Sequence, residues 1–331
     1  MTTLRWGVLS TANIARGALI PAIHASSTSE LRAVASRDEA KARAFADEND
    51  IPVAYGSYEE LLADPDVDAI YNPLPNHLHV PWTIKAMEHG KHVLCEKPIS
   101  LDTADLQPLL DAHEKMPDIV VMEAFMYRFH PRWIAAKRLV DDEAIGVVTD
   151  IDVGFSYFNR DPDNVRNQPE IGGGGLMDIG CYCISTARFL YGGEPWRGVA
   201  SLEIDADFGT DKHAHGILDF GEGRRSHFFC STQSAPFQEV RVIGSRGVMV
   251  IDWPFNAPTD VPTTIRLTVD GESREIEFAP TDQYRHQVDA FAKAVRAGGP
   301  APTPLADAVA NMTAIEAMFS SAVHNAWEPI A

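Results

Sequence analysis

Residues 4–125 alternate short apolar runs with amphipathic segments, and this alternation restricts the fold more than any other feature of the chain. Each apolar run has the length of a buried strand, and the segments between the runs carry the spacing of helices. Strands and helices that alternate in this way build a doubly wound parallel sheet with helices on both faces. We therefore predict an α/β domain with its main strands at residues 4–10, 31–36, 68–72, 93–95 and 118–125.

The pattern changes from Gly146 onward, where strands are separated by Gly and Asp turns. Several of these strands alternate apolar and polar residues, which is typical of an antiparallel sheet with one solvated or partner-covered face. A chain of 331 residues exceeds one typical domain. We predict two domains: residues 1–124, and an α+β domain of residues 125–331 with a large, mostly antiparallel open sheet, whose final helix can pack back on the first domain.

Charge and cysteine content exclude several classes of partner. The net charge of −19 argues against nucleic acid and against anionic membrane surfaces, because both are bound mainly through clustered Lys and Arg. We see neither an apolar run of the ~20 residues that cross a bilayer nor a signal-peptide pattern. Four cysteines are scattered, and the close pair Cys181 and Cys183 lacks a second pair of metal ligands. We expect a cytoplasmic protein without a structural metal.

The loop after the first strand is where a dinucleotide-binding motif would lie. In that motif, glycines permit a tight turn and a close backbone approach to the pyrophosphate at a helix N-terminus. Here the motif is degraded to Ser10, Ala12 and Ala15, whose small side chains still leave room for the backbone. An ordinary strand-to-helix corner is the alternative. The predicted cofactor-binding residues of this loop are Ser10, Thr11, Ala12, Asn13 and Ile14.

The second strand ends in Ser36, Arg37 and Asp38. An acidic residue at this place would bind a ribose 2′-hydroxyl, whereas a serine hydroxyl and an arginine can hold a 2′-phosphate. We therefore predict NADP in preference to NAD, with Ser36 and Arg37 as ligands. Asp38 weakens the prediction, since a small shift of the loop could aim it at the ribose.

The stretch His92–Ser100, HVLCEKPIS, places Glu96, Lys97 and Pro98 directly after a buried strand. The carboxyl edge of an open parallel sheet is where ligands bind. A lysine there can equally be a surface residue whose stem packs on apolar neighbours. The proline can also form a cis Lys97–Pro98 peptide bond.

Two further segments supply candidate residues. Four glycines precede Asp178, and Asp178 and Tyr182 are four residues apart, which places them on one face of a helix. Aromatic side chains gather in the segment between the two domains, and a cleft between domains is a common ligand site. The predicted pocket residues there are Met126, Tyr127 and Phe129, with packing between domains as the alternative.

Together these segments resemble the Gfo/Idh/MocA oxidoreductases, which combine a Rossmann domain with an open-sheet domain. The resemblance is to the branch of NADP-dependent xylose dehydrogenases and dimeric dihydrodiol dehydrogenases. It implies that the EKP triplet carries the active-site Lys97, and that Glu96 and Lys97 also contact the cofactor. It implies that Asp178, Gly180 and Tyr182 form the family's second motif. It also implies dimerisation or higher assembly through the sheet face. Finally, it implies that Pro75, Asn76 and His79 lie at the cofactor site, although a lone histidine at a helix start can be purely structural.

Oxidation of an alcohol requires a group that takes the hydroxyl proton while hydride leaves for the nicotinamide. A tyrosine, with an unperturbed pKa of ~10, needs a nearby cation to act as a base near neutrality. We predict Tyr182 as the proton-transferring group, Lys97 as its electrostatic activator and Asp178 as the group that orients a substrate hydroxyl. The roles of Lys97 and Tyr182 could be exchanged.

The predicted function is oxidoreduction of a small polyhydroxylated substrate with NADP. A sugar is the main expectation, oxidised at its aldose carbon to a lactone or reduced as a keto sugar. The alternatives are a trans-dihydrodiol dehydrogenase, an anhydrosugar or ketosugar reductase, and a non-catalytic NADP-bound sensor of a sugar pathway. Retention of Lys97, Asp178 and Tyr182 argues against the sensor, which need not keep a proton-transfer set.

Overall fold

The computed structural model describes residues 3–330. Residues up to Phe129 form one compact unit together with Asp282–Ala308, and His130–Thr281 form the second with the residues from Val309 onward. The predicted division after residue 124 lies shortly before the point where the chain leaves the first unit. The first unit also takes in a later segment that the sequence-based division did not include.

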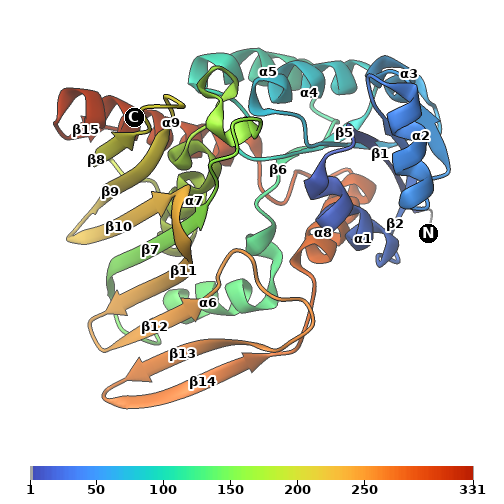
Figure 1. Ribbon diagram of the computed structural model, residues 1–331. Coiled ribbons are helices and arrows are strands. Elements are labelled where there is room, and N and C mark those ends of the chain that lie inside the picture. The colour runs from blue at the N-terminus through green and yellow to red at the C-terminus, as the bar shows by residue number, and fades with distance from the viewer. Residues whose placement is uncertain (1–2, 331) are drawn as a thin grey trace. The chain divides into compact units, whose positions relative to one another are not determined.

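Within the described residues, the first unit contains a six-stranded sheet in the order β3-β2-β1-β4-β5-β6, and each neighbouring pair is parallel. Its order, with β1 at the centre and the chain winding outward in both directions, is the predicted doubly wound topology (Figure 1). The strands are β1 (Leu4–Leu9), β2 (Ser29–Ala35), β3 (Val53–Tyr55), β4 (Ala69–Asn72), β5 (His92–Cys95) and β6 (Val121–Glu123).

Helices cover this sheet, and several begin at a side chain that accepts a backbone N–H, as Asp38 and Ser57 do. Helix α8, which lies far along the chain, carries Val288, Phe291 and Ala292 into the core of the first unit, where the rings of Phe291 and Trp6 lie 5.2 Å apart. The helices are α1 (Ile20–His24), α2 (Glu39–Glu48), α3 (Tyr58–Ala63), α4 (His79–Glu88), α5 (Thr103–Lys115) and α8 (Gln283–Ala297).

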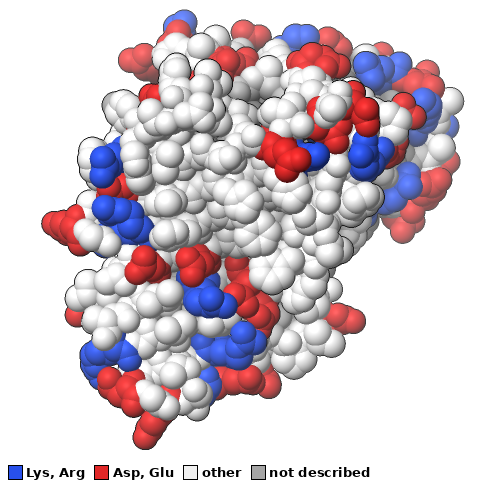
Figure 2. Space-filling model, turned by 60° about the vertical axis from the view of Figure 1, so that its left-hand side comes forward, with Lys and Arg blue, Asp and Glu red and all other residues white. Residues whose placement is uncertain are grey.

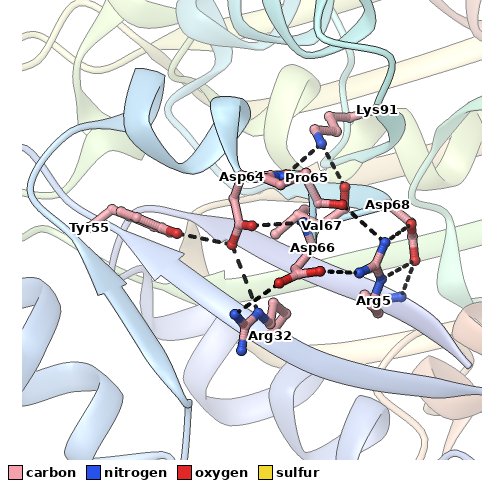
Figure 3. A network of polar contacts seen from close by, with 9 residues as sticks. All are labelled: Arg5, Arg32, Tyr55, Asp64, Pro65, Asp66, Val67, Asp68 and Lys91. Carbon is pink, nitrogen blue, oxygen red and sulfur yellow. Dashed lines mark hydrogen bonds and ion pairs between the residues drawn. The ribbon is translucent and has the colours of Figure 1, made fainter.

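The amino ends of β1, β4 and β5 are joined by a network of charged side chains (Figure 3). The Arg5 guanidinium donates to both carboxylate oxygens of Asp68, from Nε at 2.9 Å and from Nη2 at 2.8 Å. Lys91 is buried, and its ammonium donates to the carbonyl oxygens of Asp64 and Val67, each at 2.7 Å. These contacts hold the turn between α3 and β4 at the edge opposite to the one where ligands of such sheets bind.

Among the residues that the structure describes, the second unit contains a nine-stranded sheet in the order β14-β13-β12-β11-β7-β10-β9-β8-β15. The pairs are antiparallel except β7 with β10, which are parallel, so the expectation of a mostly antiparallel open sheet is confirmed. The strands are β7 (Val148–Phe158), β8 (Arg197–Ile204), β9 (Asp211–Gly221), β10 (Arg224–Ser231), β11 (Gln233–Gly244), β12 (Gly247–Asp252), β13 (Thr263–Val269), β14 (Glu272–Phe278) and β15 (Glu328–Pro329).

Helices α6 (Pro131–Asp141) and α7 (Cys181–Tyr191) pack on each other, and α7 packs on β7 and β10. α7 is buried at nearly every residue, as expected of a helix that lies between a sheet and other elements. Helix α9 (Leu305–His324) begins in the first unit and continues in the second. On the molecular face shown in Figure 2, Lys and Arg are interspersed with Asp and Glu.

Candidate cofactor and catalytic site

The loop after β1 keeps the backbone conformation of a glycine-rich turn although it lacks the glycines. Ser10 has a φ of 71°, in the left-handed region that glycine normally occupies, and its amide donates to the Ala35 carbonyl at 2.9 Å. Thr11 and Ala12 are half-buried, Asn13 and Ile14 are exposed, and Ala15 is fully buried. The loop therefore offers accessible backbone at a helix start, which fits the pyrophosphate of a dinucleotide.

The end of β2 shows how Asp38 is used. Its side chain accepts the Lys41 amide at 3.1 Å and so caps helix α2, while its own amide donates to the Ser36 hydroxyl at 3.3 Å. The carboxylate that weakened the NADP prediction is thus engaged in a helix cap. Arg37 is exposed beside it.

The segment that carries Lys97 is tied to the neighbouring strands by hydrogen bonds on both sides. The Glu96 amide donates to the Asn72 carbonyl at 3.0 Å, and the buried Tyr71 hydroxyl donates to Oε1 of Glu96 at 2.6 Å. The Ile99 amide donates to Oε1 of the buried Glu123 at 2.9 Å. The Lys97–Pro98 peptide bond is cis, as predicted. Lys97 is therefore presented at the carboxyl end of β5 by a well-anchored turn.

His79 is 1% exposed, and its ring lies between two loops of this edge. Nδ1 is 2.8 Å from the Pro98 carbonyl oxygen and Nε2 is 2.6 Å from that of Leu74. Burial lowers the pKa of His79 to about 4, although the hydrogen bonds to the two carbonyls raise it. The ring is therefore neutral near pH 7 and donates to one of the two carbonyls. This geometry favours the structural alternative for His79. Pro75 and Asn76 lie half-buried on the loop that it braces.

The predicted pocket residues after β6 lie in a single helical turn, Met126–Phe129. Met126 and Tyr127 are buried, and Phe129 packs against the core of the first unit. Arg128 of the same turn forms an ion pair with Asp307 at 2.8 Å. Within this unit these side chains pack against their neighbours, and both a pocket wall and packing between domains stay predictions.

In the second unit, Asp178 lies on a wide, π-helical turn, Leu176–Gly180, that leads into α7. Oδ2 of Asp178 accepts from the Tyr157 hydroxyl at 2.6 Å and from Nε of Arg166 at 2.9 Å. The carboxylate raises the pKa of Arg166, whereas burial and then Asp178 raise the pKa of Tyr157. Tyr157 consequently remains a hydrogen-bond donor across the neutral range. Wide turns of this kind are frequent at functional sites.

Tyr182 lies in the first turn of α7 and is 6% exposed. Its ring packs against Phe155 at 5.7 Å and against Phe255 at 5.1 Å. The turn that carries Phe255 is held from α6, because the buried Arg132 guanidinium donates to the carbonyls of Asp252 at 2.9 Å and Trp253 at 2.8 Å. The orientation of Tyr182 therefore depends on an aromatic cluster whose members come from distant parts of the chain.

Asp211 on β9 explains one of the four glycines before Asp178, Gly174. A Cβ built at Gly174, where φ is 120°, would lie 2.1 Å from Oδ1 of Asp211, so a larger residue does not fit. Oδ2 of Asp211 accepts the Leu176 amide at 2.6 Å, at the start of the turn that carries Asp178. Asp211 is 3% exposed, and burial raises its pKa to about 7.

Sequence reasoning missed Tyr157, Arg166, Phe255 and Asp211. Tyr157 had one signal, since alternation along the predicted strand places it on the same face as the apolar Val153. The other residues lie in a short 3₁₀ turn, a loop and a distant strand, and no local pattern reveals their contacts. Among residues 3–330, no cluster of three or more His, Cys, Asp or Glu could hold a metal ion. Across that range, none of the helices combines the length and apolarity needed to span a membrane.

Comparison with known proteins agrees with both units. Residues 4–124 match the model of the Gfo/Idh/MocA oxidoreductase family with an NAD-binding Rossmann fold, and residues 133–250 match the Gfo/Idh/MocA C-terminal domain. The fold and these matches define the class as a two-domain dehydrogenase or reductase. The chain belongs to the Gfo/Idh/MocA family.

Curated relatives extend this similarity over nearly the whole chain. The sequence is 40% identical over 320 residues to a D-xylose 1-dehydrogenase (NADP(+)) of Haloferax volcanii, covering 96% of this chain and 97% of the relative. It is 32% identical over 284 residues to a trans-1,2-dihydrobenzene-1,2-diol dehydrogenase of Xenopus tropicalis, covering 84% and 82%. The structure resembles a 3-ketoreductase from Actinomadura kijaniata, crystallised with NADP and TDP-benzene, with a TM-score of 0.90 and 27% identity, covering 97% and 98%. The predicted resemblance is confirmed.

Proposed function

We propose that this protein is an NADP-dependent oxidoreductase that transfers hydride between the nicotinamide and a hydroxyl or carbonyl carbon of a sugar. The observation that carries the proposal is the Asp178 carboxylate, held by Tyr157 and Arg166 at the start of the helix that bears Tyr182. An oriented carboxylate and a tyrosine are what binding and deprotonating a sugar hydroxyl require. The xylose dehydrogenase relative supports the same substrate class.

In the proposed reaction, Tyr182 takes the hydroxyl proton during oxidation and returns it during reduction. Lys97 is the cation that favours the phenolate form of Tyr182, and Asp178 hydrogen-bonds a second substrate hydroxyl. An exchange of the roles of Lys97 and Tyr182 is the alternative within the same chemistry. The bound nicotinamide supplies or accepts the hydride at the reacting carbon.

The cofactor in this proposal is NADP. Ser10 to Ile14 provide the accessible backbone for its pyrophosphate, and Ser36 and Arg37 provide a hydroxyl and a guanidinium for the 2′-phosphate. Asp38, which would favour NAD, is used as the cap of α2. The NADP in the ketoreductase structure and in the name of the xylose dehydrogenase supports this choice. Pro75, Asn76 and Glu96 complete the proposed cofactor contacts, with His79 bracing them.

Two other activities and one non-enzymatic role remain as alternatives. The relative in Xenopus tropicalis favours a trans-dihydrodiol as substrate, and the ketoreductase structure favours reduction of a keto sugar. A sensor that binds NADP without turnover would not need the hydrogen bonds that Tyr157 and Arg166 donate to Asp178.

We further propose that two copies associate through the open face of the nine-stranded sheet. Phe229 and Phe237 stack there with ring centroids 5.7 Å apart, and Phe237 is 42% exposed. A Cβ at Gly154 would lie 2.6 Å from both rings, so glycine lets them lie flat across β7. Exposed aromatic surface of this kind is typical of an interface. All four cysteines are buried and none of them is in a disulfide within the described residues, which supports a reducing, cytoplasmic location.

The test is NADPH formation or consumption with a panel of aldoses, ketoses, polyols and trans-dihydrodiols. Wild type is compared with Lys97→Ala and with Lys115→Ala, which changes an exposed lysine of α5. We expect turnover in wild type and in the control, and its loss in Lys97→Ala while NADP still binds. Tight NADP binding without turnover of any substrate would favour the sensor, and full activity of Lys97→Ala would remove Lys97 from the mechanism.

A further inference from the structure

The two peptide groups of Gly174 link both members of the ion pair at the proposed substrate site. The Gly174 amide donates to the Arg166 carbonyl at 2.9 Å, and the Asp178 amide donates to the Gly174 carbonyl at 3.0 Å. The side chains of Arg166 and Asp178 meet as well, because Nε of Arg166 donates to Oδ2 of Asp178 at 2.9 Å. These three hydrogen bonds close a ring, so a shift of Gly174 would move the arginine and the carboxylate relative to each other.

Asp211, the first residue of β9, lies where a side chain at position 174 would project. A Cβ built at Gly174 would be 2.1 Å from Oδ1 of Asp211, and a Cβ at Gly175 would be 3.3 Å from Oδ2. Oδ2 also accepts the Leu176 amide at 2.6 Å. The buried carboxyl group of Asp211 is therefore close to three consecutive residues of the segment that leads to Asp178.

Backbone atoms also enclose this segment at Gly173. A Cβ built at Gly173 would lie 2.7 Å from the carbonyl oxygens of both Arg166 and Gln168. The Gly173 amide donates to the Gln168 carbonyl at 3.0 Å. A run of glycines has no side chains with which to fix its own position, so its position depends on the groups around it. Asp211 supplies one such group from the nine-stranded sheet.

We propose that Asp211 is a positioning residue for Asp178, which acts through the backbone of Gly174 and Leu176 and contacts neither substrate nor cofactor. The proposal rests on the proposed function, in which Asp178 binds a substrate hydroxyl. A carboxylate whose orientation is fixed in advance loses less freedom when the substrate binds. A change at Asp211 should therefore weaken substrate binding more than it slows the chemical step.

The experiment measures steady-state kinetics of Asp211 variants on the sugar that the substrate panel identifies, at a temperature where melting curves show every variant folded. Asp211→Ala removes the acceptor of the Leu176 amide, so we expect KM to rise roughly two- to tenfold with a smaller fall in kcat. Asp211→Ser, whose hydroxyl is too short to replace that acceptor, should behave in the same way. Asp211→Asn keeps an acceptor oxygen and should restore KM to within about twofold of wild type.

Asp219→Ala is the matched control. Asp219 is 1% exposed, lies on the same strand, and accepts the backbone amide of Gly221 at 2.9 Å. We expect this variant to be less stable than wild type with an unchanged KM, because a loss of folded enzyme lowers only the apparent kcat. The proposal would be overturned by a wild-type KM in Asp211→Ala and Asp211→Ser, or by an equal rise of KM in Asp219→Ala.

A double-mutant cycle with Arg166→Lys tests whether Asp211 acts through the ion pair. We expect Asp211→Ala to raise KM less in the Arg166→Lys background than in wild type, and strictly multiplicative effects of the two substitutions would contradict the proposal. NADP affinity, measured in parallel, should be the same in Asp211→Ala and wild type. Wild-type protein that turns over no member of the panel would instead refute the proposed function, and the role of Asp211 with it.

Discussion

The Tyr157 hydroxyl donates to Oδ2 of Asp178 at 2.6 Å, although the two residues are 21 positions apart and belong to a strand and a helical turn. Arg166 donates to the same oxygen from a short 3₁₀ turn, Val165–Asn167. A carboxylate held from two sides has a defined orientation, which a group that binds a sugar hydroxyl needs. The orientation of Asp178 in the proposed site is therefore defined by its neighbours.

Replacement of Tyr157 by Phe should reduce kcat/KM on the substrate that the panel identifies. The lost bond is to a charged group, so the expected reduction is roughly tenfold or more. Since burial and Asp178 keep Tyr157 protonated, it orients rather than transfers a proton, and KM should rise at least as clearly as kcat falls. The control is Tyr191→Phe, which removes a hydroxyl that donates to the backbone carbonyls of Thr149 and Arg225. Equal effects of the two substitutions would indicate a general loss of packing.

Arg166 offers a graded test of the same cluster. Arg166→Met removes the charge and the Nε–H donor and should lower kcat/KM strongly, whereas Arg166→Lys keeps a charge and should retain part of the activity. Steady-state kinetics of both variants, with NADP binding measured in parallel, distinguish the effects. We expect unchanged NADP affinity, because Arg166 belongs to the second unit. Indistinguishable kinetics of wild type and Arg166→Met would exclude a role for this arginine.

Much of the fold was predictable because it depends on local periodicity. The strand and helix alternation predicted the parallel sheet, and the EKP triplet after β5 placed Lys97 at its carboxyl edge. The contacts of Arg166 and Asp211 were not predictable, because Arg166 lies in a short 3₁₀ turn, Val165–Asn167, and Asp211 on a distant strand. His79 had two interpretations in sequence, and only the positions of two backbone carbonyls favour one of them.

Asp211 should make the stability of the second unit depend on pH. Burial raises its pKa to about 7 in the folded chain, whereas an unfolded aspartate titrates near ~3.9. Between these values the folded state binds more protons than the unfolded state, so the free energy of unfolding falls as pH rises from about 4 to 7.

Melting curves at a series of pH values test this effect. Asp211→Asn keeps the shape and an acceptor for the Leu176 amide but cannot ionise, so its stability should be flatter between pH ~5 and ~8 than that of wild type. Asp163→Asn, at an exposed position of the same unit, should follow wild type. Parallel curves for wild type and Asp211→Asn would contradict the raised pKa.

Lys91 provides a test at the opposite edge of the first unit (Figure 3). Its ammonium is buried and donates to the carbonyls of Asp64 and Val67, so Lys91→Met leaves two buried acceptors without this donor. The expected loss of stability is about 2 kcal/mol or more, since each unsatisfied acceptor costs about 1–3 kcal/mol. Chemical denaturation measures this loss against Lys115→Met as an exposed control. NADP affinity should not change at a temperature where both variants are folded, because the cofactor edge lies at the other end of the strands. A loss of NADP binding in Lys91→Met alone would show instead that the two edges of the sheet are coupled.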